Sequence, residues 1–167
     1  MKRTMLVYGV ISGLIIIIIN TASYELGHGH VWLGFLVMFI AFSAIFVGVK
    51  QYRDEALGGV ITFSSALMVG LGITVVASLI YVAVWEVYLS MTQYEFIDSY
   101  SSAMVEAKRQ AGATATEILA LEQEMAEFAV QYQNPLVRLP MTFIEIFPAG
   151  VLVSLVSALV LRTHKST

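Results

Sequence analysis

Four apolar runs, each long enough to cross a lipid bilayer, constrain this sequence more than any other feature. They cover roughly residues 4–21, 31–49, 60–89 and 139–161. An α-helix rises about 1.5 Å per residue, so about 20 residues cross a hydrocarbon core of roughly 30 Å. The chain is 58% hydrophobic and 13% charged, whereas soluble domains carry about 25% charged residues. Composition and run length therefore both favour an integral membrane protein.

We expect one all-α membrane domain over residues 1–167, with four transmembrane helices. The first run also has the basic start and short apolar segment of a signal peptide, but we expect it to be retained as a helix. The third run would be about 45 Å long as a helix, which exceeds the bilayer thickness. Its last two turns are therefore predicted to leave the bilayer and lead into an outer segment.

Lysine and arginine flank the runs mainly on one side, and their distribution predicts the topology. Because basic residues mark the cytoplasmic side of membrane helices, both termini are predicted to face the cytoplasm. The residues on this side are Lys2, Arg3, Lys50, Arg53, Arg162 and Lys165. Aromatic residues, which concentrate at membrane interfaces, fall at the predicted outer boundary: Tyr24, Trp32, Trp85, Tyr88 and Tyr94.

The outer segment is predicted to form a helical hairpin over about residues 95–133. Apolar residues repeat at helical spacing in two stretches, with Ile97, Tyr100, Met104 and Ala111 in the first and Ile118, Leu121, Met125, Phe128 and Tyr132 in the second. Gly112 stands where a helix C-cap falls, and Thr114 with Glu117 forms a T-x-x-E capping box. Seven acidic and two basic residues give the hairpin a net charge of −5. Such a surface attracts cationic partners or metal ions, or is simply a solvated helix face.

Ionisable residues gather at the predicted outer mouth of the bundle: Glu25, His28, His30, Glu86 and Glu145. Glu145 lies 17 positions before Arg162, about 25 Å along a helix and thus in the outer quarter of the hydrocarbon. Three hypotheses compete for this layer. It is a proton or metal site in which His28 and His30 are weak candidate ligands, a salt bridge between Arg138 and Glu145, or a set of interfacial carboxylates that snorkel to water.

The fourth run also carries packing signals. Pro148 removes a backbone hydrogen bond to Ile144, which predicts a kink beside Glu145. A strip of small residues on the face opposite Glu145 favours close helix contact: Gly150, Ser154, Ser157 and Ala158. If lipid contacts neither face, a homo-oligomer supplies the second protein surface. Gly9-x-x-x-Gly13 likewise predicts a close helix crossing.

Several enzyme and binding classes lack their sequence signals. The chain has no cysteine, which excludes disulfides and thiolate metal sites. We find no phosphate loop, no Ser nucleophile with a base, no H-E-x-x-H motif and no basic nucleic-acid patch. No charged group falls at the predicted bilayer midplane, where pumps and pores place polar residues.

Six stretches carry a family resemblance: "GLIIIIINTASY" with the glycine–histidine loop "GHGH", "VMFIAFSAIFVGVKQYRDE", "GGVITF" with "ASLIYVAVWEVYL", and "NPLVRLPMTFIEIFPAG". Over nearly its whole length the chain resembles the bacterial four-helix membrane proteins of the domain of unknown function 4199 family. The resemblance implies a bacterial inner (cytoplasmic) membrane. It implies no activity and transfers no catalytic residue.

The leading functional hypothesis is a non-enzymatic accessory, assembly or ligand-binding membrane component that uses its acidic outer hairpin and bundle mouth. The expected partners are membrane lipids, a second copy of the chain and an envelope protein at the hairpin, with no nucleic acid. No cofactor is predicted, and a metal ion or lipid is the candidate ligand. The alternatives are a small transporter or ion-handling protein that uses the carboxylates and, more distantly, an enzyme acting on a lipid-linked substrate.

Overall fold

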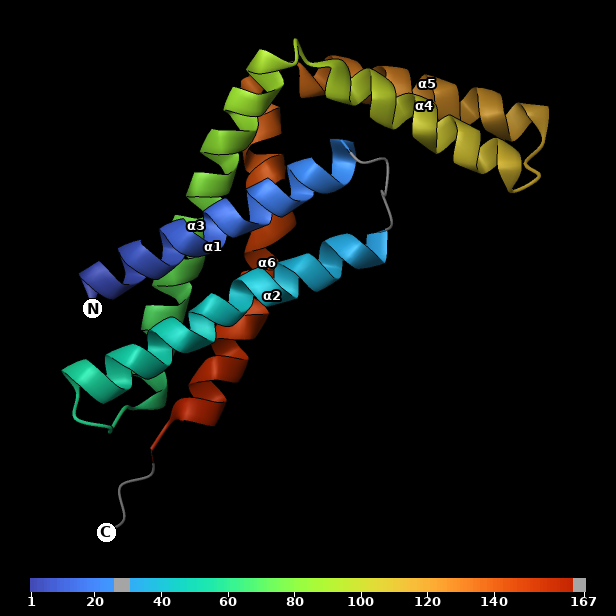
Figure 1. Ribbon diagram of the computed structural model, residues 1–167. Coiled ribbons are helices and arrows are strands. Elements are labelled where there is room, and N and C mark those ends of the chain that lie inside the picture. Colours follow the sequence, from blue (N-terminus) through green and yellow to red (C-terminus); the bar gives the residue numbers. More distant parts are fainter. Residues whose placement is uncertain (26–30, 164–167) are drawn as a thin grey trace. The chain divides into compact units, whose positions relative to one another are not determined.

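The computed structural model describes residues 1–25 and 31–163, and within them the side chains of residues 1–19 and 40–163 (Figure 1). The described residues form six α-helices and no strand, which confirms the predicted all-α class. In chain order the helices are α1 (Lys2–Glu25), α2 (Val31–Gln51), α3 (Phe63–Met91), α4 (Glu95–Gln110), α5 (Ala115–Tyr132) and α6 (Pro135–Leu161). A short π-helix, η1 (Tyr52–Ala56), continues α2.

Three described helical segments are long and apolar enough to cross a membrane. They are Lys2–Ile19 within α1, all of α3 and all of α6, and they correspond to the first, third and fourth predicted runs. α2 coincides with the second run, but its side chains before Ile40 lie outside the described residues. The chain thus has helices suited to a membrane protein, and a fourth span stays a prediction.

α6 begins at Pro135, four residues before the predicted span at residue 139. The side-chain oxygen of Asn134 accepts a hydrogen bond from the backbone N–H of Leu136 at 3.0 Å and caps the helix. Proline is tolerated at the first helical position because an N–H there would have no partner within the helix. The early start places Arg138 inside α6.

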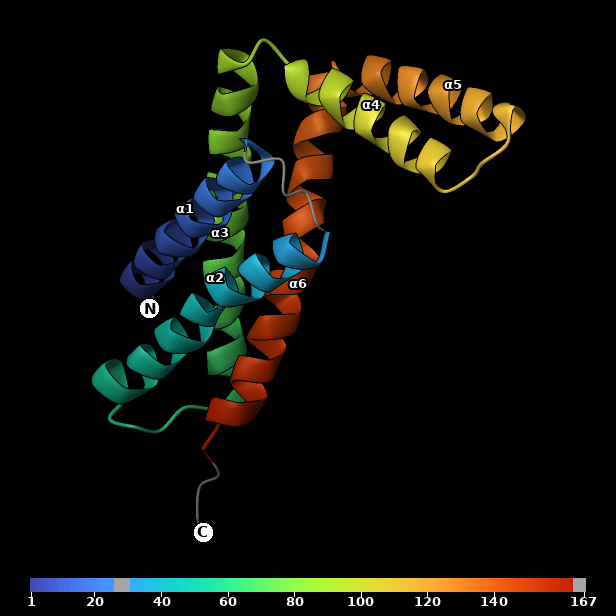
Figure 2. The same cartoon turned by 45° about the vertical axis from the view of Figure 1, so that its right-hand side comes forward.

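The chain divides into two compact units, whereas the sequence suggests one domain. The first unit comprises Met1–Val84 and Phe143–Thr167, and the second comprises Trp85–Thr142. α3 and α6 each contribute residues to both units. In the first unit, α1 and α2 lie side by side and cross α3 and α6 obliquely (Figures 1 and 2).

Glycines let the helices of the first unit approach closely. Gly13 of α1 faces α3, because a carbon added there would lie 2.8 Å from the backbone oxygen of Ala77. Gly70 of α3 faces α6, because a carbon added there would lie 2.9 Å from Cβ of Ser154. Neither position has room for a side chain, so these helices touch through their backbones, as small residues in membrane helices allow.

Two buried hydroxyls join α3 to α6 at this crossing. The side-chain oxygens of Thr74 and Ser154 lie 3.0 Å apart, and neither residue is exposed. Each hydroxyl also contacts a carbonyl one turn earlier in its own helix, that of Gly70 at 3.0 Å and that of Gly150 at 2.8 Å. Polar groups in an apolar interior must find partners within the protein, and the two hydroxyls with the two carbonyls meet this need.

Two sets of hydrogen bonds tie one end of the first unit together. The hydroxyl of Tyr8 donates to Oε1 of Gln51 at 2.6 Å and joins the start of α1 to the end of α2. After α6, Thr163 accepts the backbone N–H of Ile61 through Oγ1 at 2.8 Å and donates its own N–H to the carbonyl of Ile61 at 2.9 Å. These ties bring together the segments that carry five basic residues: Lys2, Arg3, Lys50, Arg53 and Arg162.

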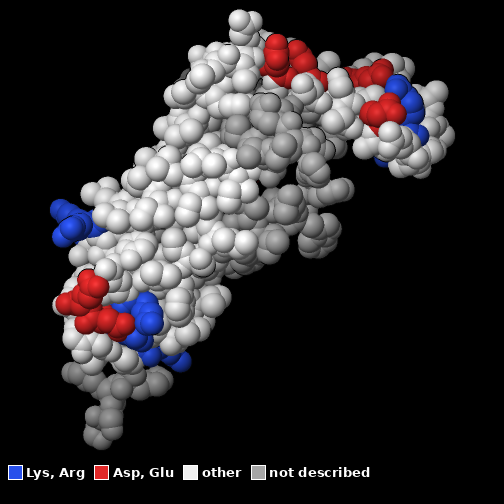
Figure 3. Space-filling model, viewed as in Figure 1, with Lys and Arg blue, Asp and Glu red and all other residues white. Residues whose placement is uncertain are grey.

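On the face of the first unit that Figure 3 shows, charged side chains occur only at this end. In Figure 3 the charged side chains of the unit lie near the N-terminus and η1. The remaining described residues of the unit on this face are uncharged. An uncharged belt beside a basic end is the arrangement expected of a bundle that crosses a membrane.

In the second unit, α4 and α5 lie side by side (Figures 1 and 2), within the range predicted for the hairpin. Gly112 follows the end of α4 with a φ of +82°, a conformation that glycine adopts without strain. The predicted capping box is confirmed. The hydroxyl of Thr114 accepts the N–H of Glu117 at 3.4 Å, and the Glu117 carboxylate accepts the N–H of Thr114 at 2.8 Å.

α4 contacts α5 through residues that lie beside its apolar repeat. Of the predicted face Ile97 is buried, but Tyr100 and Met104 are each 39% exposed. Ser101 and Val105 are half-buried and line the space between the helices. The two helices therefore meet through smaller side chains than Tyr100 and Met104 of the apolar repeat. The predicted α5 face is buried or half-buried throughout: Ile118, Leu121, Met125, Phe128 and Tyr132.

Replacing Gly70 by leucine is expected to destabilise the first unit, because the new side chain has no room against Ser154. Overpacking of this kind costs about 1–3 kcal/mol, so the melting temperature in detergent should fall. The control is Ala83→Leu, at an exposed position on the same helix, which should leave the melting temperature unchanged. Thermal unfolding followed by tryptophan fluorescence measures both, and equal effects would contradict a close α3–α6 crossing.

The start of α5 is expected to be sensitive to acid. The backbone N–H and the hydroxyl of Thr114 both bond the carboxylate and lower the pKa of Glu117 below its ordinary value of 4.5. A carboxyl with a lowered pKa stabilises the fold above its unfolded pKa and loses that contribution as pH falls through its folded pKa. Protection of the amides of residues 115–118 from hydrogen exchange should therefore decline below about pH 4.5.

Two variants separate this cap from general acid effects. Glu117→Gln should remove the pH dependence of protection at the start of α5. Glu124→Gln, which changes an exposed carboxylate on the same helix, should retain it. Indistinguishable profiles for the two variants would show that the capping carboxylate is not responsible.

Candidate functional site

Arg138 is buried although it carries a charge. Its side chain is 3% exposed and projects from the second turn of α6. A buried cation is strongly destabilising unless it is paired and its donors are hydrogen-bonded. The groups around Arg138 therefore decide whether this part of the second unit can fold.

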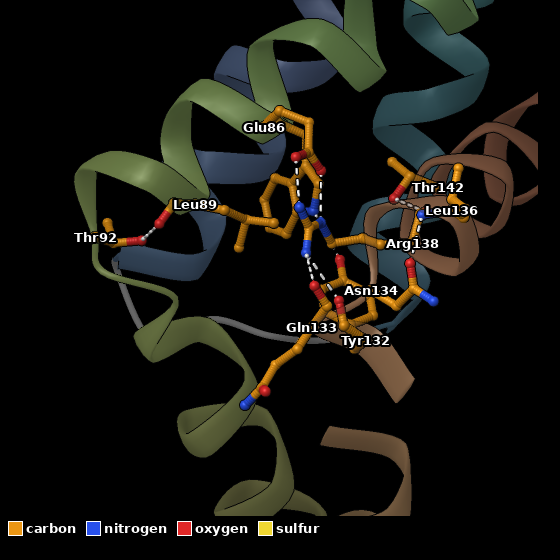
Figure 4. Close-up of polar contacts among 10 residues, drawn as sticks. Glu86, Leu89, Thr92, Tyr132, Gln133, Asn134, Leu136, Arg138 and Thr142 are labelled. Atoms are coloured by element: carbon orange, nitrogen blue, oxygen red, sulfur yellow. Dashed lines mark hydrogen bonds and ion pairs between the residues drawn. The ribbon is translucent and has the colours of Figure 1, made fainter. Parts of the chain in front are cut away.

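Glu86 of α3 supplies the opposite charge (Figure 4). Nε of Arg138 donates to Oε1 of Glu86, and Nη2 donates to Oε2, each at 2.7 Å. Two parallel bonds hold the planar guanidinium against the carboxylate, a geometry that lysine cannot reproduce. The Glu86 side chain is 27% exposed, so solvent reaches the pair from the side of the carboxylate.

The third guanidinium nitrogen caps the end of α5. Nη1 of Arg138 donates to the backbone carbonyls of Tyr132 at 2.9 Å and Gln133 at 3.3 Å (Figure 4). The last carbonyls of a helix have no partner within it, and a cation there also complements the helix dipole. One side chain of α6 thus joins the end of α3 to the end of α5. We call Arg138, Glu86 and these two carbonyls the Arg138 clamp.

Aromatic rings surround the clamp. The guanidinium carbon lies 5.1 Å from the ring centre of Tyr94 and 5.7 Å from that of Tyr132, within the range of cation–π attraction. Nε1 of Trp85 donates to the hydroxyl of Tyr132 at 2.9 Å, and the Trp85 ring meets Phe96 edge-on at 4.8 Å between centroids. Tyr94 and Tyr132 thus cover part of the guanidinium, and Trp85 holds the Tyr132 ring in place.

The turn between α3 and α4 places Tyr94 against the clamp. Gln93 and Tyr94 have φ values of +52° and +65°, a left-handed conformation that costs roughly 1–2 kcal/mol per residue outside glycine. The N–H of Tyr94 donates to the carbonyl of Leu89 at 2.9 Å. Strained backbone persists only where its surroundings hold it, and the contact between Tyr94 and the guanidinium is one such restraint.

Glu145 has no part in the clamp. The hypothesis of a salt bridge between Arg138 and Glu145 is wrong, because the guanidinium is bound to Glu86 and to the end of α5. Glu145 belongs to the first unit and is exposed on α6, beside Ile144, which is 63% exposed. The two remaining hypotheses for Glu145, an ion site and an interfacial carboxylate, stay predictions.

The other members of the predicted cluster lie outside the described side chains, namely Glu25, His28 and His30. Within the part of the chain that the structure describes, no three His, Asp or Glu side chains are grouped to hold a metal ion. The structure thus brings together Glu86 and Arg138 from the predicted cluster. The metal hypothesis for His28 and His30 rests on the sequence alone.

The packing residues predicted on α6 are buried within the first unit. Gly150, Ser154 and Ala158 are all buried, and a carbon added at Gly150 would overlap the side chain of Thr74. α6 continues through Pro148 without a break, and the kink there stays a prediction. The small-residue strip therefore packs against α3 of the same chain, while Glu145 lies on an exposed face.

The interior of the first unit also holds hydroxyls that form no hydrogen bond. Ser12, Ser78 and Ser157 are buried, and their hydroxyl oxygens have no partner among the described residues. Such groups are rare in folded proteins. Ser12 gave no signal in the sequence, because a single serine in an apolar run is common. The interior of this unit is therefore more polar than its composition suggests.

The α4–α5 pair buries little of its own apolar surface. Among the residues of these two helices only Ile97 and Tyr132 are buried. Apolar side chains remain exposed along both helices: Tyr100, Met104, Leu119 and Val130. Two packed helices cannot enclose a core, so their outer faces stay free for another surface.

An open groove of about 560 Å³ runs between α4 and α5. It is lined by ten residues: Asp98, Ser101, Ser102, Val105, Glu106, Arg109, Glu122, Met125, Ala126 and Ala129. Arg109 lies at one end, 2.9 Å from Glu106 and 3.9 Å from Glu122. The sequence pattern does not reveal the groove, because its walls depend on which faces of the two helices meet.

Comparison with known proteins gives one result. A family model described as "Protein of unknown function (DUF4199)" matches residues 7–163, which agrees with the resemblance in the sequence. No curated protein and no solved structure matches the chain.

Breaking the Arg138 clamp is expected to loosen the end of α5. Arg138→Gln should destabilise this region by about 3–5 kcal/mol, because it leaves a half-buried carboxylate and two carbonyls without their partner. Glu86→Gln should destabilise this region at least as much, because it leaves the buried guanidinium without its opposite charge, whereas the carboxylate that remains in Arg138→Gln is partly exposed. Hydrogen exchange of the amides of residues 128–134 measures the local opening free energy.

The same experiment tests the discarded salt bridge. Glu145→Gln removes a carboxylate from the same helix as Arg138 and should leave exchange at the end of α5 unchanged. A loss of protection in Glu145→Gln that equals the loss in Glu86→Gln would overturn the assignment of Glu86 as the partner of Arg138.

Proposed function

We propose that this chain, which belongs to the DUF4199 family of proteins of unknown function, is a non-enzymatic multi-pass membrane protein whose α4–α5 pair binds a partner protein. The free apolar and acidic surface of that pair is the observation that carries the proposal. The Arg138 clamp supports it, since the clamp holds the root of the pair in a defined geometry. The chain then acts as an accessory or assembly component of a bacterial inner membrane.

The proposed topology has four spans, with both termini in the cytoplasm and the α4–α5 pair outside. It is supported by the three apolar helical segments and by the basic end of the first unit, because basic residues mark the cytoplasmic side. The bonds of Gln51 and Ile61 join the two chain ends to that side of the unit. α2 is the proposed fourth span.

The composition of the α4–α5 pair defines the class of partner. Residues 95–133 carry seven acidic and two basic residues, so they favour a cationic surface and disfavour anionic lipid headgroups. Exposed Tyr100, Met104, Leu119 and Val130 add apolar contact area. A surface that combines exposed aromatic and Met side chains with charge is typical of protein recognition.

Homo-oligomer formation through α6 is a further part of the proposal. The small-residue strip of α6 is buried within the chain, whereas Glu145 lies on an exposed, otherwise apolar face with Ile144 and Leu152. A carboxylate at such a position is more stable against protein than against lipid. A second copy of the chain would supply that surface.

A small transporter or ion-handling protein is the second candidate, and exposed Glu145 within α6 favours it. An ionisable residue in a membrane segment is by default a candidate functional group. Glu86 supports this candidate less, because its carboxylate is bound to Arg138. We therefore place partner binding first.

The absence of cysteine from the sequence makes single-cysteine variants the sharpest test. Met104→Cys places a thiol on the exposed face of α4, and Leu57→Cys places one after η1, also at an exposed position. In right-side-out membrane vesicles from a bacterial host, a membrane-impermeant maleimide should label Met104→Cys. It should label Leu57→Cys only after permeabilisation.

A photoactivatable crosslinker attached to the same thiols then tests partner binding. Met104→Cys should give one covalent product with a different protein, identified by mass spectrometry, and Leu57→Cys should not. The purified pair should then re-form a complex in detergent. Crosslinks to the chain itself alone, or labelling of Leu57→Cys from outside, would contradict the proposal.

A further inference from the structure

The groove between α4 and α5 is long enough to lie against about three turns of a helix. Its α4 wall extends from Asp98 to Arg109, which corresponds to about 16 Å or three helical turns. We propose that this groove binds a basic amphipathic helix of the partner protein. The inference rests on the proposed function, in which the α4–α5 pair binds a protein, and it adds the site and the chemistry of the bound segment.

The middle of the groove suits close contact with a helix. Both walls carry small side chains, Ser101 and Ser102 on α4 and Ala126 and Ala129 on α5. Small residues at an interface let two helix backbones approach one another. Val105 and Met125 add apolar area, and methionine adapts its shape to different partners. This stretch accommodates the apolar face of an incoming helix.

Carboxylates stand toward both ends of the groove. Asp98 lies toward the end near the start of α4, whereas Glu106 and Glu122 lie toward the other end. The charged groups are thus separated by an uncharged middle stretch. A helix with basic residues about two turns apart, on either side of small apolar residues, complements this pattern.

Arg109 shows which chemical group the second end accepts. Its guanidinium lies 2.9 Å from the carboxylate of Glu106 and 3.9 Å from that of Glu122, so the two carboxylates already hold a cation. All three side chains are about half exposed, and exposed ion pairs are worth at most about 1 kcal/mol. A lysine or arginine of the partner can therefore replace Arg109 at small cost.

Charge also argues against other occupants of the groove. A second copy would bring its own acidic α4–α5 pair, with a net charge of −5 over residues 95–133, against the same surface. Like charges repel at such an interface. Anionic lipid headgroups are disfavoured for the same reason. A cationic protein segment is the occupant that the surface complements.

A synthetic peptide tests the site with the full-length chain in neutral detergent. The probe is a fluorescent helix with alanine and leucine on one face and lysines spaced to match Asp98 and Glu106. The control peptide has the same composition in an order that breaks the apolar face. Fluorescence anisotropy should show saturable binding of the probe and much weaker binding of the control peptide.

Paired variants of the chain separate the groove from general attraction. Asp98→Asn with Glu122→Gln removes two charges from the groove and should weaken binding about tenfold or more. Glu124→Gln with Glu127→Gln removes the same charge from exposed positions that do not line the groove. It should weaken binding by less than about threefold.

A second pair of variants works in the opposite direction and adds no bulk. Arg109→Gln removes the internal cation from the groove and should strengthen binding of the probe. Lys108→Gln makes the same charge change at a neighbouring residue that does not line the groove and should strengthen it less. Circular dichroism checks that each variant keeps its helix content. If the acidic variants unfold, the comparison of Arg109→Gln with Lys108→Gln decides whether the groove is the binding site.

The outcomes distinguish the two proposals. Equal effects within each pair of variants, or equal binding of both peptides, would overturn the groove as the site. If crosslinking at Met104→Cys still captures a protein, the proposed function stands and the partner binds another face of α4 and α5. Binding of the probe to the groove without any crosslinked partner would support the site and overturn the proposed cellular role.

Discussion

The second unit depends on the burial of one guanidinium. The side chain of Arg138 is 3% exposed, and an unpaired cation there would be strongly destabilising. Glu86 neutralises the charge, the carbonyls that end α5 accept a further nitrogen, and two tyrosine rings cover the group. Because these acceptors come from the ends of α3 and α5, the Arg138 side chain holds together the end of the α4–α5 pair at which α4 begins and α5 ends. Holding this end allows two helices with almost no core of their own to keep a defined geometry.

The first unit is held together by different means. Its helices touch where glycine leaves the backbone uncovered, at Gly13 against Ala77 and at Gly70 against Ser154. In lipid, apolar side chains gain little by leaving the solvent, so close van der Waals packing and hydrogen bonds drive helix association. The pair of hydroxyls on Thr74 and Ser154 fits this principle. The first unit, which is proposed to lie in lipid, is thus held by close packing. The second unit, which is proposed to lie in water, is held by a pair of opposite charges.

These properties of the two units give the proposed function a physical basis. In the proposed function the first unit is the membrane anchor, and the binding surface is a pair of helices whose groove is acidic toward its ends and uncharged in the middle. Tyr100 and Met104, which belong to the apolar repeat of α4, are exposed. These exposed side chains and the net charge of −5 over residues 95–133 are the basis for proposing a cationic partner.

The sequence by itself determined the helical class, the apolar runs and the capping box of Thr114 and Glu117, because these follow from composition, periodicity and short-range hydrogen bonds. It also grouped Glu86 with Arg138, since both stand at the same predicted end of their helices. Only the tertiary structure decided that Glu86, and not Glu145, binds the guanidinium. It also decided which face of α4 meets α5 and that a groove lies between them. The physical reason is that pairing and facing depend on the rotation and distance of helices that are far apart in sequence, which local periodicity does not encode.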